Sequence, residues 1–99
     1  MDDAVRKIIE GNIDNALKFP KEHEKGYRDS VAKLGIEPSL ETMLSYFSGL
    51  LLGLFLAYYR FKKNCEPNIE EIDEFHDLMK RRVWELRQKL LETRLHEEK

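Results

Sequence analysis

The sequence predicts an all-α protein, a four-helix bundle-like domain with a central apolar third helix and a long fourth helix. Three observations lead to this prediction. No stretch alternates apolar and polar residues as a half-buried β-strand does, and no Asn-Gly or Asp-Gly hairpin signal occurs. Apolar residues instead recur every three or four positions, which is the period of a helix. Three prolines divide the chain into four segments of this kind.

The composition is that of one globular domain, residues 1–99. Hydrophobic residues make up 41% of the chain and charged residues 36%, which allows a modest core. The formal net charge of −2 provides no bulk attraction to nucleic acid, so we expect no nucleic-acid partner. The single cysteine excludes an internal disulfide bond, and we expect a cytoplasmic protein. A single glutamine beside 17 Lys and Arg and 19 Asp and Glu residues is typical of thermophilic proteins.

The first helix is expected over residues 3–19. Asp2 or Asp3 can cap its start, because a side-chain oxygen there accepts a hydrogen bond from a free backbone N–H. Pro20 ends or kinks the helix, since proline cannot donate the backbone hydrogen bond that continues it. One apolar stripe is expected to face the core, and it consists of Val5, Ile8, Ile9, Ile13, Ala16 and Leu17.

The second helix is expected over residues 21–34 and has a thinner apolar stripe. Its members are Tyr27, Val31 and Leu34. Gly35 is suited to the left-handed conformation that commonly follows the last turn of a helix. Pro38 blocks any continuation.

The third helix, expected over residues 39–63, has no charged residue from Thr42 to Tyr59. Ser39 can cap its start. At about 100° per residue, its apolar residues fall on two lines. A seam of large residues follows a heptad spacing: Leu40, Leu44, Phe47, Leu51, Leu54, Tyr58 and Phe61. A line of small residues lies roughly 150° away: Ser45, Gly49, Gly53 and Ala57, flanked by Leu52 and Leu56.

A helix that is apolar all round either spans a membrane or lies at the centre of a bundle. A span needs about 20 apolar residues, and the 18 charge-free residues here include threonine, serine and glycine. We therefore expect a buried central helix and no membrane partner. The small line predicts a homodimer in which two copies of this helix cross near about −50°, because glycine has no Cβ to hold another backbone away. The expected interface comprises Ser45, Gly49, Gly53, Ala57, Leu52 and Leu56.

The fourth helix is expected to follow Asn68 and to continue to about His96 without glycine or proline. Asn68 and Glu71 have the spacing of a capping box. About 28 residues at about 1.5 Å each measure about 42 Å, which is long for a chain of this size. The first half is acidic and the second half basic, an order that matches the helix dipole and would let two copies pair antiparallel. The main seam consists of Ile72, Met79, Val83, Leu86 and Leu90, with His76 in line as a core or interface histidine.

Trp84, Leu91 and Leu95 lie together, roughly 120° around the fourth helix from that seam. Two interpretations remain open. These residues pack against the first helix of the same chain, or they form a second interface for another copy or for a protein partner. Tryptophan is a typical anchor of such interfaces.

An acidic run, EEIDEFHD, is the main candidate for a metal site. Glu70, Glu71 and Glu74 share one helix face, and carboxylates so placed can bind hard cations. Their EExxE spacing resembles that of the all-α, magnesium-dependent nucleotide pyrophosphohydrolases. The resemblance covers five residues, and the ExxD motif that this family has on a following helix finds no counterpart after Glu74. It implies an alternative function as such an enzyme, with magnesium held by Glu70, Glu71, Glu74 and Asp77.

No phosphate-binding loop, dinucleotide-binding glycine pattern, zinc-ligand spacing or nucleophile elbow is present, so we expect no catalytic residue and no cofactor. The basic residues 80–82, followed by Trp84, can be a nucleic-acid contact or a solvated helix face. The acidic run before them favours the solvated face. The function we expect is that of a non-enzymatic, homo-oligomeric interaction module of unknown specific role, or of a small subunit of a larger assembly.

Overall fold

The computed structural model describes residues 1–97, with side chains as far as Arg94, and this part of the chain contains four helices. The helices are α1 (Asp3–Lys18), α2 (Pro20–Lys33), α3 (Leu40–Lys62) and α4 (Ile69–Glu97). The predicted all-α fold is confirmed. Each helix begins and ends within one residue of the position expected from the sequence.

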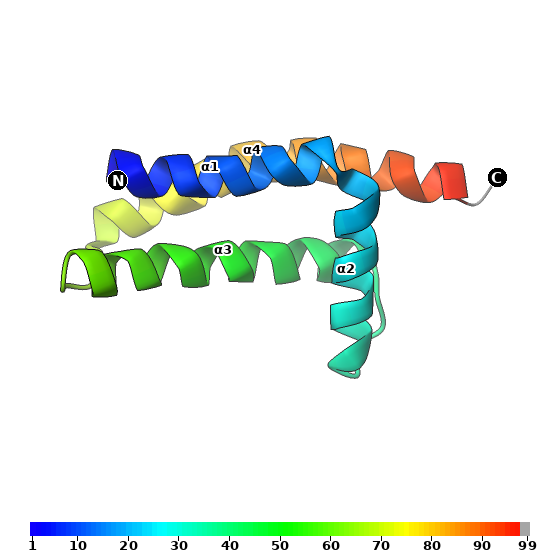
Figure 1. Cartoon of the computed structure of the whole chain (residues 1–99), viewed down its shortest axis with the longest axis horizontal. Helices are drawn as coiled ribbons and strands as arrows, with labels where there is room; N and C mark the ends of the chain where they lie inside the picture. The colour runs from blue at the N-terminus through cyan, green and yellow to red at the C-terminus, as the bar shows by residue number, and fades with distance from the viewer. Residues whose placement is uncertain (98–99) are drawn as a thin grey trace.

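The protein is elongated, with extents of 48 × 26 × 18 Å. Figure 1 shows α1, α3 and α4 along the long axis, with α3 running opposite to the other two. α2 stands across them at one end and projects beyond α3 on the side away from α1 (Figure 1). The protein is therefore L-shaped, with α3 along the inside of the long arm and α2 as the short arm.

Local hydrogen bonds explain where the helices begin. The Asp2 carboxylate accepts a hydrogen bond from the backbone N–H of Ala4 at 2.8 Å, which caps α1. At the start of α4, the Asn68 and Glu71 side chains accept from each other's backbone N–H at 2.8 and 3.0 Å, so the predicted capping box is confirmed. Pro20 begins α2 as its first residue, a position where a missing N–H costs little.

The start of α3 and the end of α2 also follow local rules. The Ser39 hydroxyl accepts from the N–H of Thr42 at 3.1 Å, and the Thr42 hydroxyl accepts from the N–H of Ser39 at 2.8 Å. Thr42 thus completes a capping box that the sequence analysis did not anticipate. Gly35 has a φ of +80°, the left-handed conformation expected after the last turn of α2.

The core lies where α1, α3 and α4 meet, with α2 closing one end. α3 contributes residues that recur mainly every four positions: Leu40, Met43, Phe47, Leu51, Phe55 and Tyr59. The predicted heptad seam is partly wrong, because Leu54 is 39% exposed and Phe61 is 82% exposed. Phe55 and Tyr59, 0% and 1% exposed, take the places assigned to Leu54 and Tyr58.

A similar one-residue correction applies to α4. Phe75 and Leu78 are buried, whereas His76, expected in the core or at an interface, is exposed in the protomer. Positions 75 and 76 differ by about 100° around the helix, so burying the larger apolar Phe75 turns the imidazole outward. The ring of His76 keeps one local hydrogen bond, between Nδ1 and the carbonyl oxygen of Ile72 at 3.0 Å.

A polar cluster around Asp2 joins the start of α1 to the end of α3. The Asp2 carboxylate pairs with the Lys63 ammonium at 2.8 Å and accepts a hydrogen bond from the Tyr58 hydroxyl at 3.0 Å. The backbone N–H of Asp2 donates to the Tyr59 hydroxyl at 3.1 Å. The hydrogen bond from Lys63, followed by that from the N–H of Ala4, lowers the pKa of the Asp2 carboxyl from 3.8 to about 2.

We predict that Asp2→Asn removes an acid-sensitive part of the stability. Asparagine still caps the helix, but it cannot pair with Lys63. Because the pKa of Asp2 is lower in the folded protein than in the unfolded chain, the ion pair stabilises the fold above about pH 4 and loses this effect as the pH falls to about 2. Thermal melts across this range should show a lower melting temperature for the variant at neutral pH and a vanishing difference in acid. A difference that is constant with pH would contradict this assignment.

Candidate association surface

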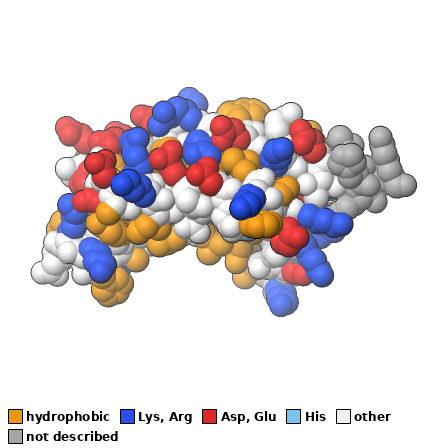
Figure 2. All heavy atoms as spheres, turned by 45° about the horizontal axis from the view of Figure 1, so that its top comes forward, with side chains coloured by type: hydrophobic (Ala, Val, Ile, Leu, Met, Phe, Trp, Pro, Cys, Tyr) orange, Lys and Arg blue, Asp and Glu red, His pale blue; other side chains and the backbone are white. Residues whose placement is uncertain are grey.

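One side of α3 is apolar and is not covered by the rest of the chain. Leu50 is 51% exposed and Leu54 is 39% exposed, although no charged residue occurs between Thr42 and Tyr59. We define the outer face of α3 by its exposed residues: Ser45, Gly49, Leu50, Gly53, Leu54 and Phe61. Figure 2 shows hydrophobic side chains gathered along the lower margin of the molecule, where α3 lies, while charged side chains of both signs cover the upper part.

Within the described residues, the chain itself covers only one side of α3. α1 and α4 both pack on the same side of α3, and α2 crosses only its first turns. A three-helix layer of this kind covers one face of each helix. The structure thus leaves open the face that carries the predicted line of small residues.

The glycines of the outer face border open space. A Cβ atom built on Gly49 or on Gly53 would meet no other described residue within 4 Å. Ala57, Leu52 and Leu56 are half-buried, and the two leucines pack against the core. Of the predicted interface on α3, Ser45, Gly49 and Gly53 are fully available to another molecule, and the other residues lie at its edges.

A hollow of about 370 Å³ lies in the corner between the end of α2 and the start of α3. We call it the corner hollow, and it is lined by Val31, Leu34, Ile36, Glu41, Thr42, Ser45 and Tyr46. Leu34 is 65% exposed and Ile36 is 48% exposed, so Leu34 does not join the core as its place in the stripe of α2 suggested. This hollow was not predicted, because its one local signal in the sequence is a pair of apolar residues on either side of Gly35.

Trp84, the proposed anchor on α4, lies on a different surface. It is 61% exposed, and the guanidinium of Arg87 stacks over its ring at 5.5 Å. It lies about 160° around α4 from the buried Leu86, so it points away from the core. Arg87 also pairs with Glu41, at the start of α3, at 4.0 Å. Leu91 packs against the core, and the side chain of Leu95 lies outside the described residues. The predicted interface residues therefore occupy two separate surfaces.

Two of the four acidic residues proposed as metal ligands at the start of α4 make contacts within the chain. The Glu71 carboxylate belongs to the capping box, and the hydrogen bond from the N–H of Asn68 lowers its pKa. Glu74 pairs with the amino group of Met1, while Glu70 and Asp77 are exposed. Within the described residues, no three His, Cys, Asp or Glu side chains come together in a way that could hold a metal ion.

The basic run of α4 also takes part in internal contacts. Arg82 pairs with Asp14 at 2.6 Å and with Glu10 at 3.4 Å, both on α1, and with Glu85 at 2.7 Å. These ion pairs tie α1 to α4 and leave Lys80 and Arg81 as the exposed cations of the run. Lys80 and Arg81 line a hollow together with Arg6, Glu74 and Asp77, so acidic side chains lie beside these cations.

Comparison with known proteins finds no matching family model, no matching curated protein and no matching solved structure. Among the described helices, α3 is the one that is long and apolar enough to cross a membrane, and 28% of its most apolar stretch is buried within the chain. What this protein does must therefore be argued from its own surfaces, of which the outer face of α3 is the most distinctive.

We predict that Leu51 and Leu54 respond differently to replacement by glutamine. Leu51 is 2% exposed, so Leu51→Gln should lower the free energy of unfolding by about 3 kcal/mol or more, through lost burial and a buried amide. Leu54→Gln should change the stability of the isolated protomer by less than about 1 kcal/mol. Urea unfolding at low protein concentration measures both values. Equal losses would mean that the predicted heptad seam, and not the observed spacing, faces the core.

Proposed function

We propose that this protein is a non-enzymatic helical interaction module that forms a homodimer through the outer face of α3. The observation that supports this proposal is the absence of charge over 18 consecutive residues of a helix whose outer face is exposed. Charged residues make up 36% of the chain, and the exposed faces of α1 and α4 carry both signs. An exposed apolar patch of this extent on an otherwise charged protein is typical of an association surface.

The charges at the two ends of α3 are compatible with a second copy as the occupant. Glu41 lies in the first turn, is 74% exposed and pairs within the chain with Arg87 at 4.0 Å. In the last turn, Arg60 is 62% exposed and pairs with Glu66 at 3.0 Å, and Lys62 is exposed. When two copies of α3 pair antiparallel around a two-fold axis, the acidic start of each faces the basic end of the other. A parallel pair would place like charges side by side.

The shape of the protein favours the same arrangement. α2 projects past one end of α3, so two copies in parallel would bring their α2 helices together and hold the α3 helices apart there (Figure 1). An antiparallel pair places the α2 helices at opposite ends. The outer faces can then meet along their length.

Insertion of α3 into a bilayer is less compatible with the fold. A spanning α3 would have to leave α1 and α4, which would expose the buried Phe47, Leu51 and Phe55 and the apolar faces packed on them. Burying a large apolar side chain contributes about 1.5–3 kcal/mol each, so this separation would cost much of the core. Association of two folded copies covers the outer face and leaves the core intact.

We predict a dimer of the 11.8 kDa chain that depends on Gly53. Gly53→Gln should convert it to a monomer, because a long polar side chain would separate two closely packed helices. Gly11→Gln on α1 is the matched control, since that glycine is also exposed, in mid-helix and free of neighbours within 4 Å among the described residues. Glutamine is a better helix former than glycine by roughly 0.5 kcal/mol, so neither protomer should be destabilised.

Size-exclusion chromatography with light scattering measures the mass of each variant. The expected result is a dimer for the original chain and for Gly11→Gln, and a monomer for Gly53→Gln. A monomeric original chain at high micromolar concentration would contradict the proposed function. A Gly53→Gln dimer as tight as the original would place the interface elsewhere, for example on the surface around Trp84.

A further inference from the structure

The outer face of α3 alone is small for a stable dimer. A helix of 23 residues is about 35 Å long and about 10 Å wide, which gives a contact of roughly 350 Å². Specific interfaces bury about 800 Å² on each partner. If the proposed dimer is correct, further contacts are needed at the ends of α3, and the L-shape of the protomer has complementary features there.

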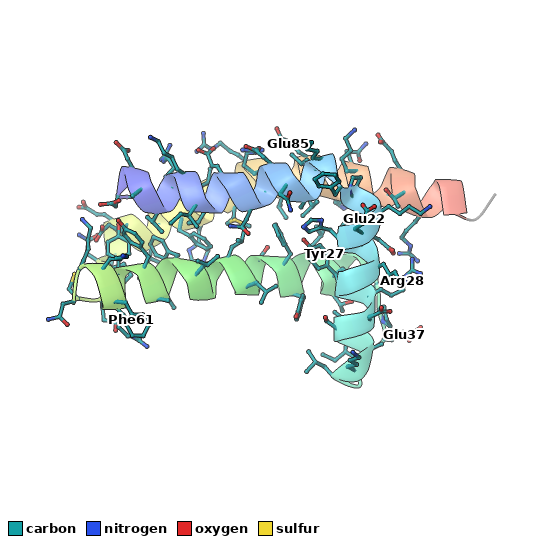
Figure 3. All side chains as sticks on the ribbon, in the orientation of Figure 1. Glu22, Tyr27, Arg28, Glu37, Phe61 and Glu85 are labelled. Carbon is teal, nitrogen blue, oxygen red and sulfur yellow. The ribbon has the colours of Figure 1, made fainter. Side chains whose placement is uncertain are left out.

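The first of these features is Phe61, in the last turn of α3. Its side chain is 82% exposed, the highest exposure among the large hydrophobic residues described. Figure 3 shows Phe61 below the end of α3, on the side toward which α2 projects at the opposite end. The aromatic ring therefore extends from one end of the outer face.

The second feature is the corner hollow at the other end. Its volume is about 370 Å³, and a cavity of about 150 Å³ is enough to hold a benzene ring. Leu34, Ile36 and Tyr46 provide apolar walls, and Glu41 lies at its edge. The hollow thus offers an apolar site for an aromatic ring beside an acidic group.

Antiparallel pairing brings the two features together in one register. The α3 residues that line the hollow, 41 to 46, centre near position 44, so placing position 61 of a second copy there puts the two-fold axis near residue 52. Gly49 and Gly53 then lie beside the axis, where the two backbones approach most closely. The apolar and steric features thus agree on a single alignment.

We propose that, in the homodimer, Phe61 of each copy fills the corner hollow of the other. Both ends can stay in contact only when the α3 helices cross at a shallow angle, so the geometry is closer to the class near about 20° than to the −50° crossing expected from the four-residue line of small residues. The projecting α2 acts as a wall that fixes the register. The dimer is then held by two symmetric aromatic contacts with the glycine crossing between them.

Phe61→Ser tests the aromatic contact. Because position 61 is exposed, the substitution should change the stability of the protomer by less than about 0.5 kcal/mol. The dissociation constant of the dimer should rise by about 100-fold or more, because two buried rings are lost per dimer. Trp84→Ser is the matched control, since Trp84 is also an exposed aromatic residue but belongs to α4 and not to α3. It should change the dissociation constant by less than about threefold.

A cysteine pair tests the register. In a Cys65→Ser background, which removes the single native thiol, Ser45→Cys and Arg60→Cys should form an intermolecular disulfide under mild oxidation. Within one chain these positions are about 22 Å apart along α3, too far for the Cα separation of roughly 4–7 Å that a disulfide requires. The double variant should therefore give a cross-linked dimer. Each single variant should give a much lower yield of it.

The outcomes separate this inference from the proposed function on which it rests. A dimer by light scattering that shows neither the cross-link nor a response to Phe61→Ser would overturn the register and leave the dimer standing. A monomeric original chain would overturn both. Sedimentation of that monomer with phosphatidylcholine and phosphatidylglycerol vesicles would assign the outer face to lipid instead.

Discussion

The packing of α3 against α1 and α4 determines the shape of the whole protein. Residues spaced mainly by four place Phe47, Leu51 and Phe55 on one side of α3, and the ring of Phe55 stacks on that of Phe75 in α4 with a centroid distance of 5.0 Å. α1 covers the same side, so the core is complete with a single face of α3. Because α3 has no charged residue from Thr42 to Tyr59, this choice of face leaves an uncharged face, with Leu50 and Leu54 exposed, open to the outside.

The position of α2 follows from the same constraint. α1 ends at Phe19, whose φ of −124° and ψ of 60° redirect the chain, and Pro20 starts the next helix at once. α2 then crosses the end of the core through Tyr27 and Val31 and carries its last turn past α3. The result is a rigid corner beside the open face. Association and shape are therefore linked, since the same helix that closes the core also limits how another molecule can approach.

The sequence was sufficient to locate the helices, but it said little about which face of each helix is buried. Caps and terminators are local, so Asp2, Gly35 and the Asn68–Glu71 pair could be identified from the chain alone. Whether Leu54 or Phe55 is buried could not be predicted, because a helix without charged residues lacks the polar contrast that distinguishes an exposed face from a buried one. In α4, the predicted seam residues Met79, Leu86 and Leu90 are buried, but Phe75 takes the place in the core beside His76.

The candidate site was predictable to a similar degree. Three small residues four apart, Ser45, Gly49 and Gly53, could be recognised as a line along which another backbone can approach, and the structure places them on the open face. The corner hollow depends on how α2 and α3 meet in space, so no sequence pattern marks it. Trp84 met the compositional criterion for an interface anchor, but its direction on α4 is set by the burial of Leu86 on the opposite side.

The most direct test of the central claim is an isotope-filtered NMR experiment on an equal mixture of labelled and unlabelled chains. It detects only contacts between different copies. The account predicts nuclear Overhauser effects between the α-protons of Gly53 in the two copies, and between the ring of Phe61 and the side chains of Leu34 and Ile36. Intermolecular effects confined to Trp84 and its neighbours, or none at all at millimolar concentration, would contradict it.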